Sequence, residues 1–201
     1  RTRDSEVAPL VNSINESVNA LEGLFSELLD ITRLDSGAIE VNPRDFAVGD
    51  ILRRLRLHFE ASAFEKGLGL RLRGASCVVF ADPLLVERIV RNLVANAIRY
   101  TEDGTVLVGC RRHGEMVRLE VWDSGCGIEP EYYGRIFKLF KRNHTEEIPG
   151  HGIGLAFCKK VIEHHGGRIW VKSKYGRWST FFFTLPALPP PPEPPRAPQS
   201  P

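Results

Sequence analysis

The sequence lacks the features that mark several common classes of protein. Its four cysteines, Cys77, Cys110, Cys126 and Cys158, are far apart, form no CxxC pair and have no histidine at zinc-finger spacing. Neither a disulfide framework nor a zinc knuckle is therefore favoured, and we expect reduced, buried thiols. The formal net charge is only +2, which gives no electrostatic signature of nucleic-acid binding.

Long apolar runs are also missing. No stretch approaches the roughly 20 residues of a membrane-spanning helix, and no signal-peptide pattern opens the chain. We expect a cytoplasmic location. The sequence does not begin with methionine, which suggests that a part upstream of Arg1 is absent, and we expect membrane attachment only through that part. The 201 residues have room for one domain with a solid core and a helical appendage.

The first part of the chain shows one amphipathic pattern. Between Val7 and Leu34 apolar residues recur every three or four positions, as along one face of a helix. A stripe this long has no partner within its own helix, so we expect residues 7–34 to pair with another helix or to form a homodimer. The helix should end near Gly37, which closes a segment of residues 1–37.

The rest of the chain mixes helical and strand patterns. Helices are predicted at 48–66, at 82–100 with Asp82 as N-cap, and at 154–164. Strands are predicted at 39–41, 68–73, 78–81, 106–112, 117–122, 168–173 and 180–185. This order predicts an α+β fold, a two-layer α/β sandwich with a mainly antiparallel sheet, over residues 38–186. Residues 187–201 are rich in proline, which predicts a disordered or polyproline II tail.

Two asparagines form the first of three candidate clusters. Asn92 and Asn96 are four positions apart on a predicted helix, so their amides share a face that Arg99 and Tyr100 continue. Amides on an otherwise apolar helix are unfavourable unless a polar group meets them. An amide oxygen would suit Mg²⁺ bound to nucleotide phosphates, but hydrogen-bonded core amides explain this pair alone equally well.

The second cluster follows a predicted strand. After Asp123, Gly125 and Gly127 let the backbone turn tightly and approach a flat ligand. A buried carboxylate here can accept a hydrogen bond from the exocyclic amine of adenine, whereas guanine presents a carbonyl, so ATP is favoured over GTP. Taken alone, this tripeptide is also an ordinary turn.

The third cluster places Gly150, Gly152 and Gly154 ahead of a predicted helix. Free N–H groups and the dipole at a helix N-terminus favour phosphate oxygens. The spacing is neither that of a P-loop nor that of a GxGxxG loop. Lys141 and Arg142 can add cationic contacts to the phosphates, or they can lie on a solvated helix face.

The order of the clusters carries more information than any one of them. With Phe137 and Phe140 between the second and the third, it resembles the sensor histidine kinases of two-component signalling, within the wider group of ATPases that includes gyrase B, Hsp90 and MutL. RIVRNLVANAIRYT is similar to the N box, DSGCGI to the G1 box, IFKLFKR to the F box and GHGIGLAFCKKVIEHHGG to the G2 box. ESVNALEGLFSELLDITRLDSG is similar to the second helix of the dimerisation and phosphotransfer module.

This resemblance implies the Bergerat fold, with a lid between the F and G2 boxes that closes over ATP and Mg²⁺. Asn96 would bind the metal, and Asn92 and Arg99 would contact phosphates. Tyr100 would contact the adenine side and Asp123 would read adenine. The implied ATP-binding set is Asn92, Asn96, Arg99, Tyr100, Asp123, Gly125, Gly127, Ile128, Phe137, Lys141, Arg142, Gly150, Gly152, Ile153, Gly154, Leu155 and Thr180.

One part of the family pattern, the H box with the phosphorylated histidine, is absent, because none of the six histidines lies in such a motif. We therefore expect the γ-phosphoryl group to pass to a histidine on an absent segment or partner chain, and then to a response regulator receiver domain. The chain alone should not autophosphorylate. The alternative is a non-catalytic nucleotide-binding dimerisation module that regulates another kinase. A gyrase- or Hsp90-like ATPase is disfavoured, because the proline-rich tail leaves no room for a transducer domain.

Overall fold

The computed structural model describes residues 41–74, 76–139 and 152–187, together with the single positions Val18, Phe25, Leu29 and Thr32. The helices are α2 (Val48–Glu65), α3 (Pro83–Tyr100) and α4 (Gly154–His164), with a short 3-10 helix at Pro130–Tyr132. The strands are β1 (Arg44–Ala47), β2 (Gly69–Arg73), β3 (Val78–Ala81), β4 (Thr105–His113), β5 (Met116–Asp123), β6 (Ile169–Lys174) and β7 (Trp178–Pro186).

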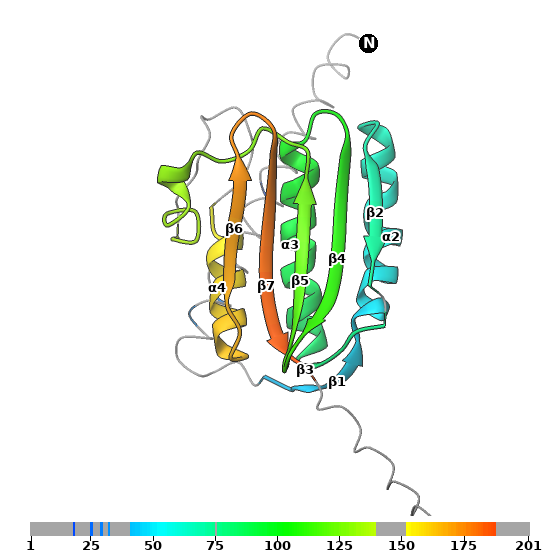
Figure 1. Ribbon diagram of the computed structural model, residues 1–201, viewed down its shortest axis with the longest axis vertical. Helices are drawn as coiled ribbons and strands as arrows, with labels where there is room; N and C mark the ends of the chain where they lie inside the picture. Colours follow the sequence, from blue (N-terminus) through cyan, green and yellow to red (C-terminus); the bar gives the residue numbers. More distant parts are fainter. Residues whose placement is uncertain are drawn as a thin grey trace, which may run out of the picture.

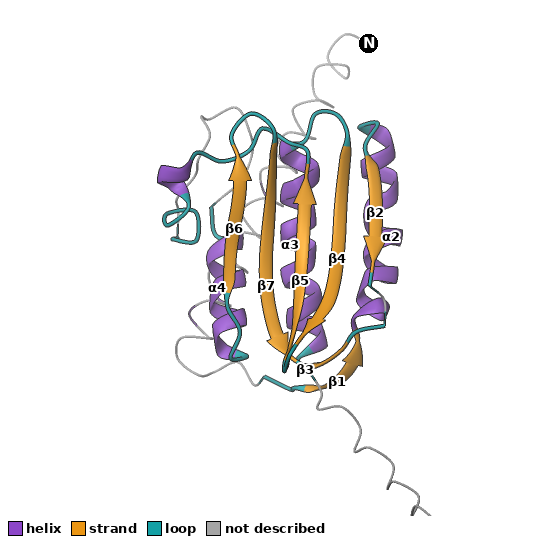
Figure 2. Cartoon of the chain, in the orientation of Figure 1, coloured by secondary structure: helices purple, strands orange, loops and turns teal. Residues whose placement is uncertain are grey.

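The architecture is a two-layer sandwich, as predicted. Five strands form a sheet in the order β2-β4-β5-β7-β6, and α2, α3 and α4 lie behind it (Figures 1 and 2). All pairs in this sheet are antiparallel except β2 and β4, which are parallel. A separate antiparallel pair, β1 and β3, lies at one end.

The predicted helices agree with the structure to within one residue, because each has both an apolar stripe and a clear start or end. At the start of α3 the Asp82 side chain accepts hydrogen bonds from the amides of Leu84 and Leu85, at 2.9 and 3.2 Å. Of the strand predicted at 39–41, residues 39 and 40 lie outside the described residues and Val41 lies in no strand; the first strand of the described residues is β1. Its Arg44 and Asp45 are polar and exposed, so only pairing with β3 reveals it.

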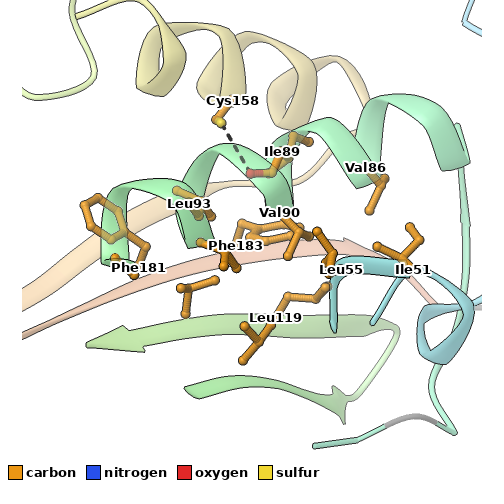
Figure 3. Packing of buried hydrophobic residues seen from close by; sticks show 14 of the residues in the cluster. Ile51, Leu55, Val86, Ile89, Val90, Leu93, Leu119, Cys158, Phe181 and Phe183 are labelled. Atoms are coloured by element: carbon orange, nitrogen blue, oxygen red, sulfur yellow. Dashed lines mark hydrogen bonds between the residues drawn. The ribbon is translucent and has the colours of Figure 1, made fainter. Parts of the chain in front are cut away.

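The core lies between the helices and the sheet. Ile89 and Leu93 of α3 are fully buried together with Leu119 of β5 and Phe183 of β7, and Figure 3 shows these side chains converging. The Cys158 thiol of α4 donates to the Ile89 carbonyl at 3.9 Å. Complete burial of each such side chain contributes roughly 1.5–3 kcal/mol. Helix α3 is thus held by packing against the sheet and against α4.

All four cysteines are free thiols, but the prediction that they are buried holds only for Cys158. Cys77 and Cys110 are half-buried, and Cys126 is exposed because it lies in the loop that leaves β5. Burial, with a smaller contribution from the Cys77 thiol, raises the pKa of Cys110 to about 12, so this thiol stays protonated.

The predicted first helix lies almost wholly outside the described residues. Val18, Phe25 and Leu29 have helical geometry and expose 46%, 60% and 51% of their surface. These three apolar side chains are exposed at the described positions, and the homodimer stays a prediction. Within the described residues, no helix combines the length and apolarity that crossing a bilayer requires.

Candidate functional site

Asp123 stands at the end of β5 on the side of the sheet that faces the helices. Its residue exposure is only 4%, and β5 pairs it with Ser179 of β7. The carboxylate accepts a hydrogen bond from the Gly125 amide at 3.0 Å. Burial raises the pKa of Asp123 to about 6, and the backbone amides of Gly125 and Ser179 act in the opposite direction. The group is therefore a buried acceptor with no ion-pair partner among the described residues.

The loop after Asp123 is fastened to the end of α3. The Cys126 amide donates to the Tyr100 carbonyl at 3.3 Å. A side chain at Gly125 would overlap that carbonyl oxygen and would approach the Asp123 Oδ1 atom to 2.8 Å. Only glycine fits there without movement of the backbone, so this glycine brings Tyr100 and Asp123 together.

The same loop is fastened to β6 through Ser173. The Ile128 amide donates to the Ser173 hydroxyl at 2.7 Å, and that hydroxyl donates to the Trp178 carbonyl at 2.7 Å. Its oxygen also lies 3.1 Å from the hydroxyl oxygen of Ser179. Gly127, with φ +71°, packs so closely on β6 that a side chain would overlap the Lys174 carbonyl.

Sequence reasoning missed Ser173 and Ser179, although a signal existed. Ser179 is the one polar residue in the alternating series that continues with Phe181 and Phe183, and alternation places all three on one face of the sheet. A serine at the head of an inward apolar series suggests a polar neighbour. That neighbour, Asp123, becomes visible only through the pairing of β5 with β7.

Asn92 meets the start of α4. The amide group of Asn92 lies against Gly154, where an added side chain would overlap its Oδ1 atom. Helix α4 begins at Gly154, and its N-cap Ile153 offers no side-chain hydrogen bond. Gly152 has φ +69°, a conformation that suits glycine. The first amides of a helix have no partner within the helix, and beside an asparagine they form a surface that favours an anion.

The last turn of α3 carries the other predicted residues of that helix. Asn96 and Tyr100 are half-buried, and Arg99 is exposed. A residue that sequence reasoning missed, Lys66, closes this helix: its Nζ atom donates to the carbonyls of Ile98, Arg99 and Thr101 at 2.9, 3.2 and 3.5 Å. The lysine satisfies carbonyls that a helix end otherwise leaves without partners.

The remaining predicted residues are placed less centrally. Ile153 is buried, Leu155 is half-buried, and the Phe137 ring packs edge-on against Phe181 with centroids 6.3 Å apart. Thr180 pairs with Trp122, so alternation directs its side chain to the sheet face opposite Asp123. Lys141, Arg142 and Gly150 lie outside the described residues.

No group of three or more His, Cys, Asp or Glu side chains that could hold a metal occurs within residues 41–74, 76–139 and 152–187. A hollow of about 290 Å³ between α2 and β2 shares no residue with the cluster around Asp123. It is lined by Gly49, Leu52, Arg53, Arg56, Leu72, Arg73 and Gly74. The candidate site rests on two contacts of α3, that of its last turn with the Asp123 loop and that of Asn92 with the start of α4.

Comparison with known proteins points to one family. The profile described as "Histidine kinase-, DNA gyrase B-, and HSP90-like ATPase" matches residues 81–189. The chain is 30% identical to the adaptive-response sensory kinase SasA of Synechococcus elongatus, over 88% of this chain and 47% of that protein. It is 33% identical to cyanobacterial phytochrome A of Nostoc, over 91% of this chain and 24% of that protein. The chain thus spans about half or less of the length of these curated relatives.

Solved structures agree. Full-length ShkA in complex with AMPPNP superposes with a TM-score of 0.79 at 29% identity, covering 88% of this chain and 38% of that one. The catalytic domain of the histidine kinase ThkA superposes with a TM-score of 0.66 at 29% identity, covering 73% of this chain and 96% of that one. The fold described above is therefore that of histidine kinase catalytic domains.

Proposed function

Because this chain belongs to the family of histidine kinase-, DNA gyrase B- and HSP90-like ATPases and carries the ATP-binding catalytic domain of histidine kinases, we propose that it binds Mg-ATP at the Asp123 cluster and presents the γ-phosphoryl group to a histidine supplied from elsewhere. The observation that carries the proposal is the buried Asp123 carboxylate, which no cation in the described part of the chain neutralises.

Adenine recognition follows from the chemistry of Asp123. An ionised carboxylate only accepts hydrogen bonds, so it complements the exocyclic amine of adenine and opposes the carbonyl of guanine. Gly125, Gly127 and Ile128 shape the backbone beside it, with Tyr100 on the α3 side. ShkA, which has the same fold, has been solved in complex with AMPPNP, an analogue of ATP, and this supports binding of an adenine nucleotide.

Phosphate binding falls to α3 and α4. Asn92 and Arg99 would contact phosphate oxygens, and the α4 amides near Gly154 would add donors. Leu155 and Ile153 hold this helix start in place, while Lys141, Arg142 and Gly150 would contribute from the lid.

Mg²⁺ fits the donor chemistry around Asn96. The half-buried Asn96 offers one hard amide oxygen, and no acidic cluster competes for the ion among the described residues. This suits an ion that keeps several waters and takes its other ligands from phosphates. When bound, the ion neutralises charge on the phosphates.

The phosphoryl acceptor is proposed to lie on an absent segment or a partner chain. Two of the described histidines are engaged within the fold: His165 Nε2 accepts from the Asp82 amide at 3.1 Å, and His58 Nε2 lies 3.3 Å from an Arg91 guanidinium nitrogen. A receiver domain is the proposed next partner, because ThkA has been solved with the response regulator TrrA. Dimerisation through residues 7–34 and a cytoplasmic location complete the proposal.

Calorimetric titration of the whole chain tests nucleotide binding. ATP with Mg²⁺ should bind, and GTP should bind about five- to 150-fold more weakly, because one lost or opposed hydrogen bond costs about 1–3 kcal/mol. Asn96→Ala should abolish the gain in affinity that Mg²⁺ provides while leaving metal-free binding in place. Equal affinities for ATP and GTP would contradict the assignment of Asp123.

Incubation with labelled ATP tests the transfer step. The chain alone should retain no acid-labile phosphate, whereas addition of a full-length histidine kinase whose own nucleotide site is inactivated should give phosphohistidine on that partner. If the partner stays unlabelled and its kinase activity changes when its own site is intact, the chain is instead the regulatory module.

A further inference from the structure

The sheet has one face that no described helix covers, here called the open face. Figure 1 looks onto it, with α2, α3 and α4 behind the strands. Side chains alternate along a strand, and on β5 the buried residues alternate with Arg118, Glu120 and Trp122, which are half-exposed. These three residues therefore belong to the open face.

All three tryptophans of the chain lie on the open face. Strand pairing places Trp122 of β5, Trp170 of β6 and Trp178 of β7 there, each half-exposed, together with Phe182. The Trp170 and Phe182 rings are stacked, with centroids 5.4 Å apart and an interplanar angle of 15°. Tryptophan and arginine are the residue types that concentrate binding energy in protein interfaces.

The charged residues of the open face are mostly cations. By strand register and burial, the cations on or beside it are Arg71, Arg73, Arg111, Arg118, Arg168, Lys172 and Lys174. The only acid of the five strands that points to this face is Glu120, which pairs with Arg118 at 3.5 Å. Of the ion pairs among the described residues, none involves the other six cations. Because the whole chain has a net charge of only +2, the basic residues gathered on this face are separated from most of the acidic residues.

The geometry of the rings distinguishes between two kinds of anionic partner, a nucleic acid and an acidic polypeptide. Binding of bases requires free aromatic faces. Here Trp170 already stacks on Phe182, the Arg168 guanidinium lies 4.8 Å from the Trp170 centroid, and that of Arg118 lies 5.3 Å from the Phe182 centroid. Ring edges and guanidinium groups remain for a partner, and these suit carboxylates. A second copy of the chain would bring two positive faces together, which is unfavourable.

We propose that the open face is a docking surface for an acidic polypeptide, held by Arg71, Lys172 and the neighbouring cations around a centre of Trp122 and Trp170. This surface lies on the side of the sheet opposite the Asp123 carboxylate, so a partner can dock there while nucleotide occupies its own site. The inference therefore adds an interaction to the proposed kinase function and stands on separate residues.

Fluorescence titration of the whole chain with a short poly-glutamate peptide tests the surface. The peptide should shift the tryptophan emission at low ionic strength, and the affinity should fall steeply with added salt. The double variant Arg71→Glu, Lys172→Glu should weaken binding about tenfold or more. The matched variant Lys159→Glu, Lys160→Glu makes the same change in net charge on α4 and should bind as the parent chain does.

Several results would overturn the proposal. Equal losses in the two double variants would mean that net charge alone attracts the peptide, and no emission shift at low salt would mean that the face does not bind acidic chains. Tighter binding of single-stranded oligothymidine than of poly-glutamate, lost in the Arg71→Glu, Lys172→Glu variant, would assign the face to nucleic acid. A change in emission on removal of residues 188–201, without any peptide, would assign it to the proline-rich segment. ATP titration of both double variants should give the parent affinity, which separates this test from that of nucleotide binding.

Discussion

The folded chain disfavours the ionised form of the Asp123 carboxylate. Burial disfavours its charged form, and the amides of Gly125 and Ser179 compensate only in part, so its pKa is raised from 3.8 to about 6. Below pH 3.8 the folded and unfolded chains both hold the proton. Between 3.8 and about 6 only the folded chain holds it, so stability falls as pH rises through this window.

Replacement of Asp123 by Asn removes this effect. We expect Asp123→Asn to be more stable than the parent at pH 8 by about 1–3 kcal/mol, given about 1.4 kcal/mol per pKa unit, with the difference vanishing near pH 4. ATP affinity should fall at pH 8, because Asn has a single acceptor oxygen, the position that the Gly125 amide occupies in the parent, and its NH₂ group cannot accept a hydrogen bond from adenine's amine. Urea unfolding and ATP titration at both pH values measure the two effects. A variant less stable than the parent at pH 8 would contradict the assigned cause.

Gly125 is a second residue whose side chain is dictated by its neighbours. Gly125→Ala should lower the free energy of unfolding by about 1–3 kcal/mol, the usual range for overpacking, because the methyl group would overlap the Tyr100 carbonyl. Gly134→Ala is the matched control, since no atom lies within 4 Å of a side chain there. Comparable effects of the two substitutions in urea unfolding would refute the steric explanation.

At the scale of the element, the end of α3 depends on a residue from another helix. Lys66, just after α2, donates to three carbonyls at the α3 C-terminus, where a positive charge also complements the helix dipole. This contact ties the turn that carries Asn96 and Tyr100 to the end of α2. The Asp123 loop also meets the last turn of α3, through the hydrogen bond from the Cys126 amide to the Tyr100 carbonyl.

The lysine contact can be tested with a stem-preserving substitution. Lys66→Met should lower the free energy of unfolding by about 1 kcal/mol and weaken ATP binding, because the last turn of α3 loses its cap. Lys66→Arg should recover most of both. Lys159→Met on the exposed face of α4 serves as control, since that lysine forms an ion pair with Glu163 at 3.7 Å and makes no contact with the end of α3 in the described residues. Unchanged amide exchange at the α3 C-terminus in Lys66→Met would argue against capping.

For the whole molecule, ligand binding should appear as stabilisation. A ligand that binds only the folded chain raises the free energy of unfolding by about 2.7 kcal/mol at a concentration one hundred times its dissociation constant. We therefore expect Mg-ATP to raise the thermal midpoint of the parent chain, and GTP to raise it less at the same concentration. Differential scanning calorimetry measures both shifts. If Mg-ATP raised the thermal midpoint of Asp123→Asn as much as that of the parent, the stabilisation would not depend on recognition of adenine by Asp123.

The helices and most strands follow from local pattern alone. The apolar stripe of α3, its Asp82 cap and the alternation of β5 are visible in sequence because their periods differ and because each helix has a chemical start or end. The pattern that singled out Asn92 and Gly154 named two residues that lie in contact, while their roles in a nucleotide site stay a prediction. By contrast, β1 was not visible, since Arg44 and Asp45 show no apolar alternation and the strand exists only through its pairing with β3.

Sequence by itself therefore determined the three helices, most of the strands and the polar residues that interrupt them, because helix and strand periods and turn residues act over a few positions. Only the tertiary structure decided which side chains share a space. The pairing of β5 with β7 sets Ser179, and not Thr180, beside Asp123. The crossing of α2 with α3 brings Lys66 to the α3 end, and the pairing of strands far apart in sequence gathers three tryptophans on one face. These are contacts between distant segments, which no local pattern specifies.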